Sequence, residues 1–189
     1  MPSGAEIFSR FRHLPVDLRL PSGWVSGTFL VPESQSLQDF LATSGPFLKL
    51  IDATVPGHES AVPFFAVRRE ATELVAPQVE ESHVETPGSA GITSPWGVIC
   101  LFDRGLLEGR LDFLTNQRLS DYLRGHSGFL VVREAAWIPL DGDRVGESRH
   151  WPIALANVSR LNGVSELPTQ PGRGHPGRLA PTEFGEPGR

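Results

Sequence analysis

Several kinds of chemistry are missing from this sequence. The chain has 189 residues and a single cysteine, Cys100, so it cannot form an intramolecular disulfide bond. Cys100 lies in the apolar run 98–102, which favours a small buried core residue. No apolar run approaches the roughly 18 residues of a membrane span, and the N-terminus lacks the apolar core of a signal peptide. We therefore expect a cytoplasmic protein with no membrane span of its own.

Positive charge is also scarce. Lysine and arginine number 17 against 22 aspartates and glutamates, which gives a net charge of −5. Because a basic surface usually drives nucleic-acid binding, this balance weighs against a nucleic-acid partner. The histidines show no His-x-x-x-His spacing, and neither a phosphate-binding Gly-x-x-x-x-Gly-Lys-Ser/Thr loop nor a Gly-x-Ser-x-Gly elbow is present. The sequence thus predicts a non-enzyme with no catalytic residue, no metal and no cofactor.

Two pairs of residues are candidates for a functional site. Asp39 and Asp121 recur at matching positions and could act as a general acid and base. Each sits among leucines in a short predicted helix, so we interpret them as facing water or holding the turn. His58 and His150 fall in corresponding loops and could share a site, but we interpret them as solvated loop histidines.

An internal duplication is the strongest positive feature. Residues 16–53 align without a gap with residues 98–135, and the hydrophobic periodicity is preserved between the identities. Such self-similarity indicates two copies of one structural unit. The identical pairs are Val16/Val98, Gly23/Gly105, Gly27/Gly109, Gln35/Gln117, Leu37/Leu119, Asp39/Asp121, Leu41/Leu123, Phe47/Phe129, Leu48/Leu130 and Ala53/Ala135.

The duplication divides the chain into five parts. We predict an N-terminal arm over 1–15, a first unit over 16–79, an acidic Pro/Gly linker over 80–95, a second unit over 96–164 and a Pro/Gly/Arg-rich tail over 165–189. The tail composition cannot form a core, so we expect a larger protein partner to order it.

The arm carries its own pattern. Ile7, Phe8, Phe11 and Leu14 have the spacing of one helical face, which predicts a helix over residues 5–14 that ends at Pro15. This helix would cap the first unit, or it would dock on a partner or a membrane surface.

Within the first unit, alternating apolar residues and turn residues predict a β-rich structure. The expected strands cover 16–20, 24–31, 47–55, 63–67 and 72–75, with one or two helical turns over 36–42. In the second unit, 151–155 matches the strand 63–67, and the last strand is expected over 158–164. The loop between strands is longer there, over 139–150.

The hairpin of each unit has the form of a particular small fold. Gly23 and Gly27, and again Gly105 and Gly109, sit where strongly bent strands need glycine. The pattern resembles the Sm/LSm-like small barrel, and it is similar to uncharacterised bacterial proteins that carry this unit with an inserted Leu-x-Asp-Phe-Leu-type helix. The resemblance implies a mainly β chain of two tandem Sm-like five-stranded barrels, each with a short inserted helix, plus the extended arm and tail.

The RNA-binding motifs of that family are missing. RNA-binding members carry an Asp and an Asn after the second strand, where this chain reads Pro-Glu-Ser-Gln-Ser over 32–36. They carry an Arg-Gly pair before the last strand, where this chain reads Arg-Arg-Glu over 68–70 and Asn-Val-Ser-Arg over 157–160. The family's RNA site is therefore not carried over.

Four functional hypotheses follow. The first is a non-catalytic interaction or scaffold subunit whose partner is a larger protein assembly. The second is an extrinsic accessory subunit at the cytoplasmic face of a membrane complex, such as a respiratory or photosynthetic one, bound peripherally through a partner. The third is an RNA-binding Sm-like regulator, and the fourth is an enzyme with a site between the units. Exposed aromatics and arginines favour protein contacts, and the predicted partner-binding residues are Ile7, Phe8, Phe11, Trp137, Arg144, Trp151, Arg173, Arg178 and Phe184.

Overall fold

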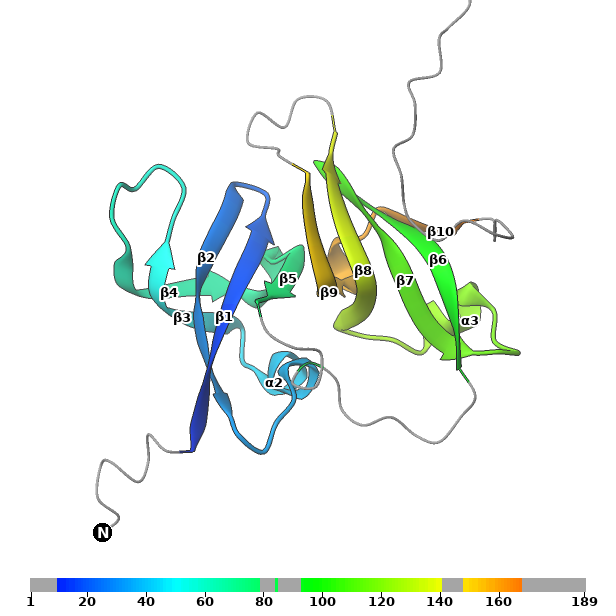
Figure 1. Ribbon diagram of the computed structural model, residues 1–189, viewed down its shortest axis with the longest axis horizontal. Helices are drawn as coiled ribbons and strands as arrows, with labels where there is room; N and C mark the ends of the chain where they lie inside the picture. The colour runs from blue at the N-terminus through cyan, green and yellow to red at the C-terminus, as the bar shows by residue number, and fades with distance from the viewer. Residues whose placement is uncertain (1–9, 79–83, 85–92, 141–147, 168–189) are drawn as a thin grey trace, which may run out of the picture.

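The chain is mainly β and forms one antiparallel sheet of ten strands. The structure is a computed structural model, and it describes residues 10–78, 84, 93–140 and 148–167. We call residues 10–78 the first half and residues 93–167 the second half. The strand order is β10-β6-β7-β8-β9-β5-β1-β2-β3-β4, so each half keeps its own strands together and the two halves meet between β9 and β5 (Figure 1).

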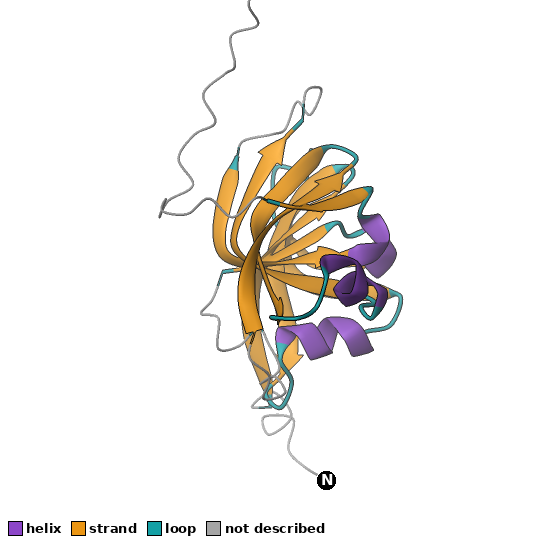
Figure 2. Ribbon diagram, turned by 90° about the vertical axis from the view of Figure 1, so that its right-hand side faces the viewer, coloured by secondary structure: helices purple, strands orange, loops and turns teal. Residues whose placement is uncertain are grey.

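The two halves have the same succession of elements. The first half contains β1 (Phe11–Leu20), β2 (Gly23–Pro32), α2 (Leu37–Thr43), β3 (Phe47–Thr54), β4 (Val62–Arg68), a 3₁₀ turn η1 (Arg69–Ala71) and β5 (Leu74–Pro77). The second half contains β6 (Thr93–Phe102), β7 (Gly105–Leu114), α3 (Leu119–Arg124), β8 (Phe129–Pro139), β9 (Arg149–Asn157), η3 (Val158–Arg160) and β10 (Gly163–Glu166). The helices lie together on one side of the strands (Figure 2).

A glycine and a bulge bend the strands at matching places. The register shifts between Ser26 and Thr28 where β2 pairs with β3, and between Glu108 and Arg110 where β7 pairs with β8. The residue opposite each shift has a positive φ, 51° at Asp52 and 48° at Glu134. A bulge of this kind increases the local twist and curves the sheet. At Gly109 a Cβ would lie 2.5 Å from Val132, so only glycine fits the close approach of β7 and β8.

Helix α2 begins with a side-chain cap. The Ser36 hydroxyl accepts a hydrogen bond from the Asp39 backbone N–H at 3.0 Å, and it donates one to the Asp39 carboxylate at 2.8 Å. This arrangement satisfies an N–H group that the first helical turn leaves unpaired. Leu37 and Leu41 lie one turn apart on the buried face, which fixes the helix against the sheet.

The two hydrophobic cores interlock across the junction. The core of the first half also contains Phe129, Val131, Ile153 and Leu155 from β8 and β9. The core of the second half also contains Trp24, Leu74 and Ala76 from β2 and β5. Neither half therefore encloses its core with its own residues alone.

Three sequence predictions require correction. The predicted helix over 5–14 is wrong from Arg10 onward, because Arg10 lies in a turn and Phe11–Leu14 pair with the end of β2 and begin β1; residues 5–9 of that prediction lie outside the described residues. β6 begins at Thr93, inside the expected linker. The last strand starts at Gly163 rather than at residue 158, because residues 158–160 form the turn η3.

Candidate interaction surface

The junction between the halves is made first by the backbone. β5 pairs with β9 so that Leu74 lies opposite Ala156 and Val75 opposite Leu155. The Asn157 N–H donates to the Glu73 carbonyl at 2.9 Å, which extends the pairing by one residue. The short β5 is therefore paired on both of its edges, with β1 on one side and β9 on the other.

Three tryptophans pack at this junction. The Trp24 ring from the first half lies 5.9 Å from the Trp137 ring and 5.3 Å from the Trp151 ring, centroid to centroid. Two guanidinium groups lie over the Trp24 ring, that of Arg149 at 4.6 Å and that of Arg19 at 5.6 Å. Aromatic pairs and cation–π contacts of this kind stabilise a desolvated interface. Trp137 is 0% and Trp151 9% exposed, so these two predicted partner-binding residues are internal to the chain.

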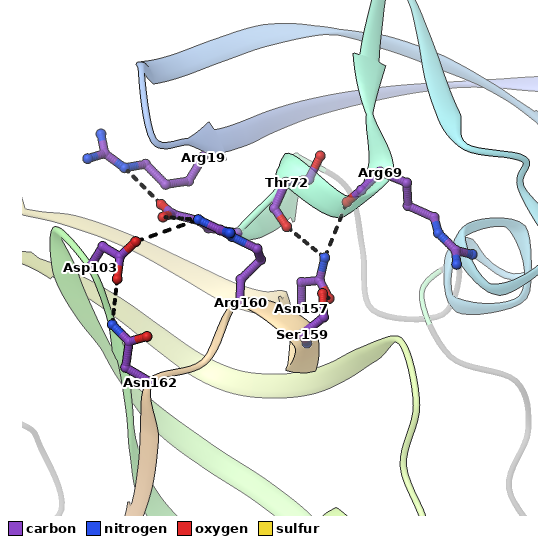
Figure 3. A network of polar contacts seen from close by, with 9 residues as sticks. Arg19, Arg69, Thr72, Asp103, Asn157, Ser159, Arg160 and Asn162 are labelled. Carbon is purple, nitrogen blue, oxygen red and sulfur yellow. Dashed lines mark hydrogen bonds and ion pairs between the residues drawn. The ribbon is translucent and has the colours of Figure 1, made fainter.

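A buried asparagine connects the two halves through hydrogen bonds. The Asn157 side-chain NH₂ donates to the Thr72 carbonyl at 2.8 Å and to the Arg69 carbonyl at 3.2 Å (Figure 3). Its Oδ1 accepts from the N–H and the hydroxyl of Ser159, at 3.1 and 2.8 Å. The first two contacts hold the turn η1 of the first half against the second half, and the two from Ser159 cap the turn η3.

Glu73 is a fully buried carboxylate at the same junction. Its oxygens lie 3.6 Å from Arg19 Nε and 4.0 Å from Arg160, and Arg160 in turn lies 3.6 Å from Asp103 (Figure 3). Burial raises the pKa of Glu73 above its ordinary value of 4.5, although the charges of Arg19 and Arg160 act in the opposite direction. These ion pairs form a structural network between the halves, in which Arg19 and Glu73 are fully buried.

The other candidate residues do not assemble into a reactive site. Asp39 lies in the first turn of α2, where its carboxylate accepts a hydrogen bond from the capping Ser36, and Asp121 forms an exposed ion pair with Arg124 at 3.1 Å. His58 Nδ1 makes a local contact with the Ser60 carbonyl at 2.6 Å, and His150 is exposed on β9. Within the described part of the chain, no group of three or more His, Cys, Asp or Glu residues could hold a metal ion. Burial raises the pKa of the Cys100 thiol to about 12.

Among the predicted partner-binding residues, only Phe11 is described and exposed, at 37%. It begins β1, opposite Pro32 at the end of β2. The remaining six, Ile7, Phe8, Arg144, Arg173, Arg178 and Phe184, lie outside the described residues.

The largest exposed aromatics lie at one end of the sheet, where sequence reasoning did not place a site. β3 and β4 pair so that Ile51 lies opposite Phe64 and Lys49 opposite Ala66. Directly opposed residues share a face, and side chains two apart do too, so Phe47, Lys49, Ile51, Phe64 and Ala66 form one surface, which we call the β3–β4 outer face. Phe47 is 50% and Phe64 57% exposed. The only sequence signal was the adjacent pair Phe64-Phe65, which makes both faces of a short strand apolar.

Comparison with known proteins adds no relative. The sequence matches no protein-family model, and no curated protein and no solved structure is significantly similar to it. In the part of the chain that the structure describes, no helix is both long and apolar enough to cross a membrane.

Proposed function

We propose that this chain is a non-catalytic protein-interaction module, a scaffold subunit built from two copies of one Sm-like unit. The matching element order of the two halves supports the duplication. So do the matching register shifts near Gly27 and Gly109 and the matching positive φ angles at Asp52 and Glu134. The bent five-stranded arrangement of each half, with its inserted helix, is what the Sm-like resemblance implies.

The β3–β4 outer face carries the interaction part of the proposal. It presents Phe47 and Phe64 about half exposed beside β4, the last strand of the sheet. An edge strand offers unpaired backbone groups for pairing with another chain. Aromatic residues dominate the binding energy of protein interfaces, and apolar residues clustered at an edge strand mark such sites.

The junction supports the scaffold part. The two halves are held together as one body by the buried tryptophan cluster and by the buried contacts of Asn157 and Glu73. A body of this kind presents its surfaces at a fixed distance and angle, which is what a scaffold requires. Nothing in the described residues favours the membrane-accessory or RNA-binding alternative.

Cross-linking and co-purification from the native host test the proposal. Tagged wild-type chain is compared with Phe47→Lys/Phe64→Lys and with a control, Leu114→Lys, whose side chain is 49% exposed on β7. We expect the wild type and the control to retain the same protein, counting copies of the chain itself, and the double variant to retain at least about tenfold less. Equal retention by all three, or retention of no protein by any, would contradict the proposal.

A further inference from the structure

The proposed function leaves open what covers the β3–β4 outer face. We propose that a second copy of this chain covers it with its β10 edge and α3, so that copies associate head to tail. This inference rests on the proposed function and names the partner. The junction between the two halves already makes a contact of the same kind within one chain.

In the second half, the face that corresponds to the β3–β4 outer face is covered by the first half. β8 and β9 have the same register as β3 and β4, with Phe129 opposite Asn157 as Phe47 is opposite Arg68. The face that corresponds to the β3–β4 outer face is therefore made by Phe129, Val131, Arg133, Ile153 and Leu155. Its four apolar members are between 0% and 9% exposed, and they belong to the core of the first half. Helix α2 of the first half packs near β8, so an adjoining half covers this face.

Among the residues that the structure describes, none covers the matching face of the first half in this way. Phe47 is 50% exposed where Phe129 is 7%, and Phe64 is 57% exposed where Ile153 is 0%. The difference arises because β9 has β5 as a neighbour and β4 is the last strand of the sheet.

The surface of the first half that covers β8 and β9 has a counterpart in the second half, at α3, β6 and β10. Leu41 of α2 is fully buried, whereas its counterpart Leu123 on α3 is only partly buried. Arg19 on β1 is fully buried against the junction, whereas its counterpart Leu101 on β6 is 38% exposed. Leu101 lies opposite Gly163 of β10, as Arg19 lies opposite Leu74 of β5. Both surfaces of the junction thus recur, with no partner among the described residues, at the opposite ends of one sheet, at β4 and at β10 (Figure 1).

The backbone of β4 permits the contact. Pro63 removes one N–H group from the edge, which usually protects a strand from pairing. Pro152 occupies the same position in β9, and β9 is nevertheless paired on both edges. The pairing with β5 uses Leu155 and Ala156, which correspond to Ala66 and Val67, beyond the proline.

Residues at the junction within one chain differ from those at the proposed contact between copies, and this difference keeps the two contacts distinct. At the junction, Arg19, Glu73 and Asn157 form the buried polar contacts. Their counterparts at the free ends are Leu101, Asn162 and Arg68. A second copy that displaced one half at the junction would take Arg160 away from the buried Glu73, or the Thr72 and Arg69 carbonyls away from the buried Asn157. Loss of such partners by buried polar groups is unfavourable. Addition therefore occurs at the free ends, where it leaves the buried polar contacts of the junction intact.

A head-to-tail contact repeats until the assembly closes on itself or grows into a filament. Each added copy again presents one β4 edge and one β10 edge. A contact between two like edges would instead stop at a symmetric dimer. The two arrangements are separated by blocking one end at a time.

Light scattering coupled to size exclusion tests the proposal on the full chain. Phe64→Lys blocks the β4 end, Leu101→Lys blocks the β10 end, and Leu114→Lys is the surface control. Phe64→Ser and Leu101→Ser serve as milder second variants, and circular dichroism checks that each variant is folded. We expect the wild type and the control to exceed the 20.6 kDa of one chain. Each blocked variant should be monomeric alone, and a mixture of the two should form a 1:1 pair of twice that mass.

Two results would overturn the inference. One is a wild type that stays monomeric up to roughly 100 µM, well above the dissociation constants of specific protein contacts. The other is a blocked variant that still self-associates, which would mean a contact between like edges or elsewhere. A monomeric wild type that still retains a different host protein through Phe47 and Phe64 would overturn this inference and leave the proposed function standing.

Discussion

Replacing Asn157 with alanine should lower the free energy of unfolding more than replacing an exposed asparagine does. The substitution removes the donors to the Thr72 and Arg69 carbonyls. Each such bond contributes about 1 kcal/mol net, and a buried carbonyl left without its donor costs about 1–3 kcal/mol more. Thr72 is fully buried, so the second cost applies. Asn157→Ala should therefore lower the free energy of unfolding by about 3 kcal/mol.

Urea titration followed by tryptophan emission measures this change, because three tryptophans lie at the junction. With a denaturant slope of about 2 kcal/mol per molar, the midpoint should fall by about 1.5 M. The matched control is Asn162→Ala, which removes an exposed hydrogen bond to Asp103 at 2.6 Å and should cost less than about 1 kcal/mol. Equal midpoints for the two variants would refute the view that Asn157 fastens the halves together.

Three further predictions concern the core and its titratable groups. Gly109→Ala places a Cβ 2.5 Å from Val132 and should cost about 2 kcal/mol or more, whereas Gly27→Ala meets its nearest atoms at 3.3 Å and should cost clearly less in the same titration. The raised pKa of Glu73 means that the folded state keeps a proton which the unfolded state releases above about 4.5, so this contribution to stability is present below that pH and lost as pH rises through the folded pKa. Glu73→Gln should remove that pH dependence, and an unchanged stability difference from the wild type between pH 4.5 and 8 would contradict it. The Cys100 thiol, with its pKa raised to about 12, should be unreactive toward a disulfide reagent at pH 8 until urea unfolds the chain.

Local patterns predicted the elements whose partners are close in sequence. The alternation over 16–20 and 24–31 indicated the β1–β2 hairpin, and the leucine spacing over 36–42 indicated α2, because turn chemistry and periodicity are local signals. The helix predicted over 5–14 is wrong over Phe11–Leu14 because the end of β2 supplies a strand partner, which the helical spacing of the pattern alone does not show.

The candidate site depended on pairings that no local pattern contains. Trp137 and Trp151 became internal because β9 pairs with β5 across the chain. Phe47 and Phe129 are identical in sequence and equivalent in register, yet one is half exposed and the other is buried. Only the order of strands in the sheet separates them, and strand order is a property of the whole chain.

The interlocked cores also change what counts as a folding unit. Leu74 and Trp24 help to fill the second half's core, while Ile153 and Leu155 help to fill the first half's core. A fragment that ends between the halves would lose side chains from the centre of its own interior. The sequence can thus be divided into two similar segments. Each segment needs side chains of the other to complete its core, so the two fold cooperatively as one unit.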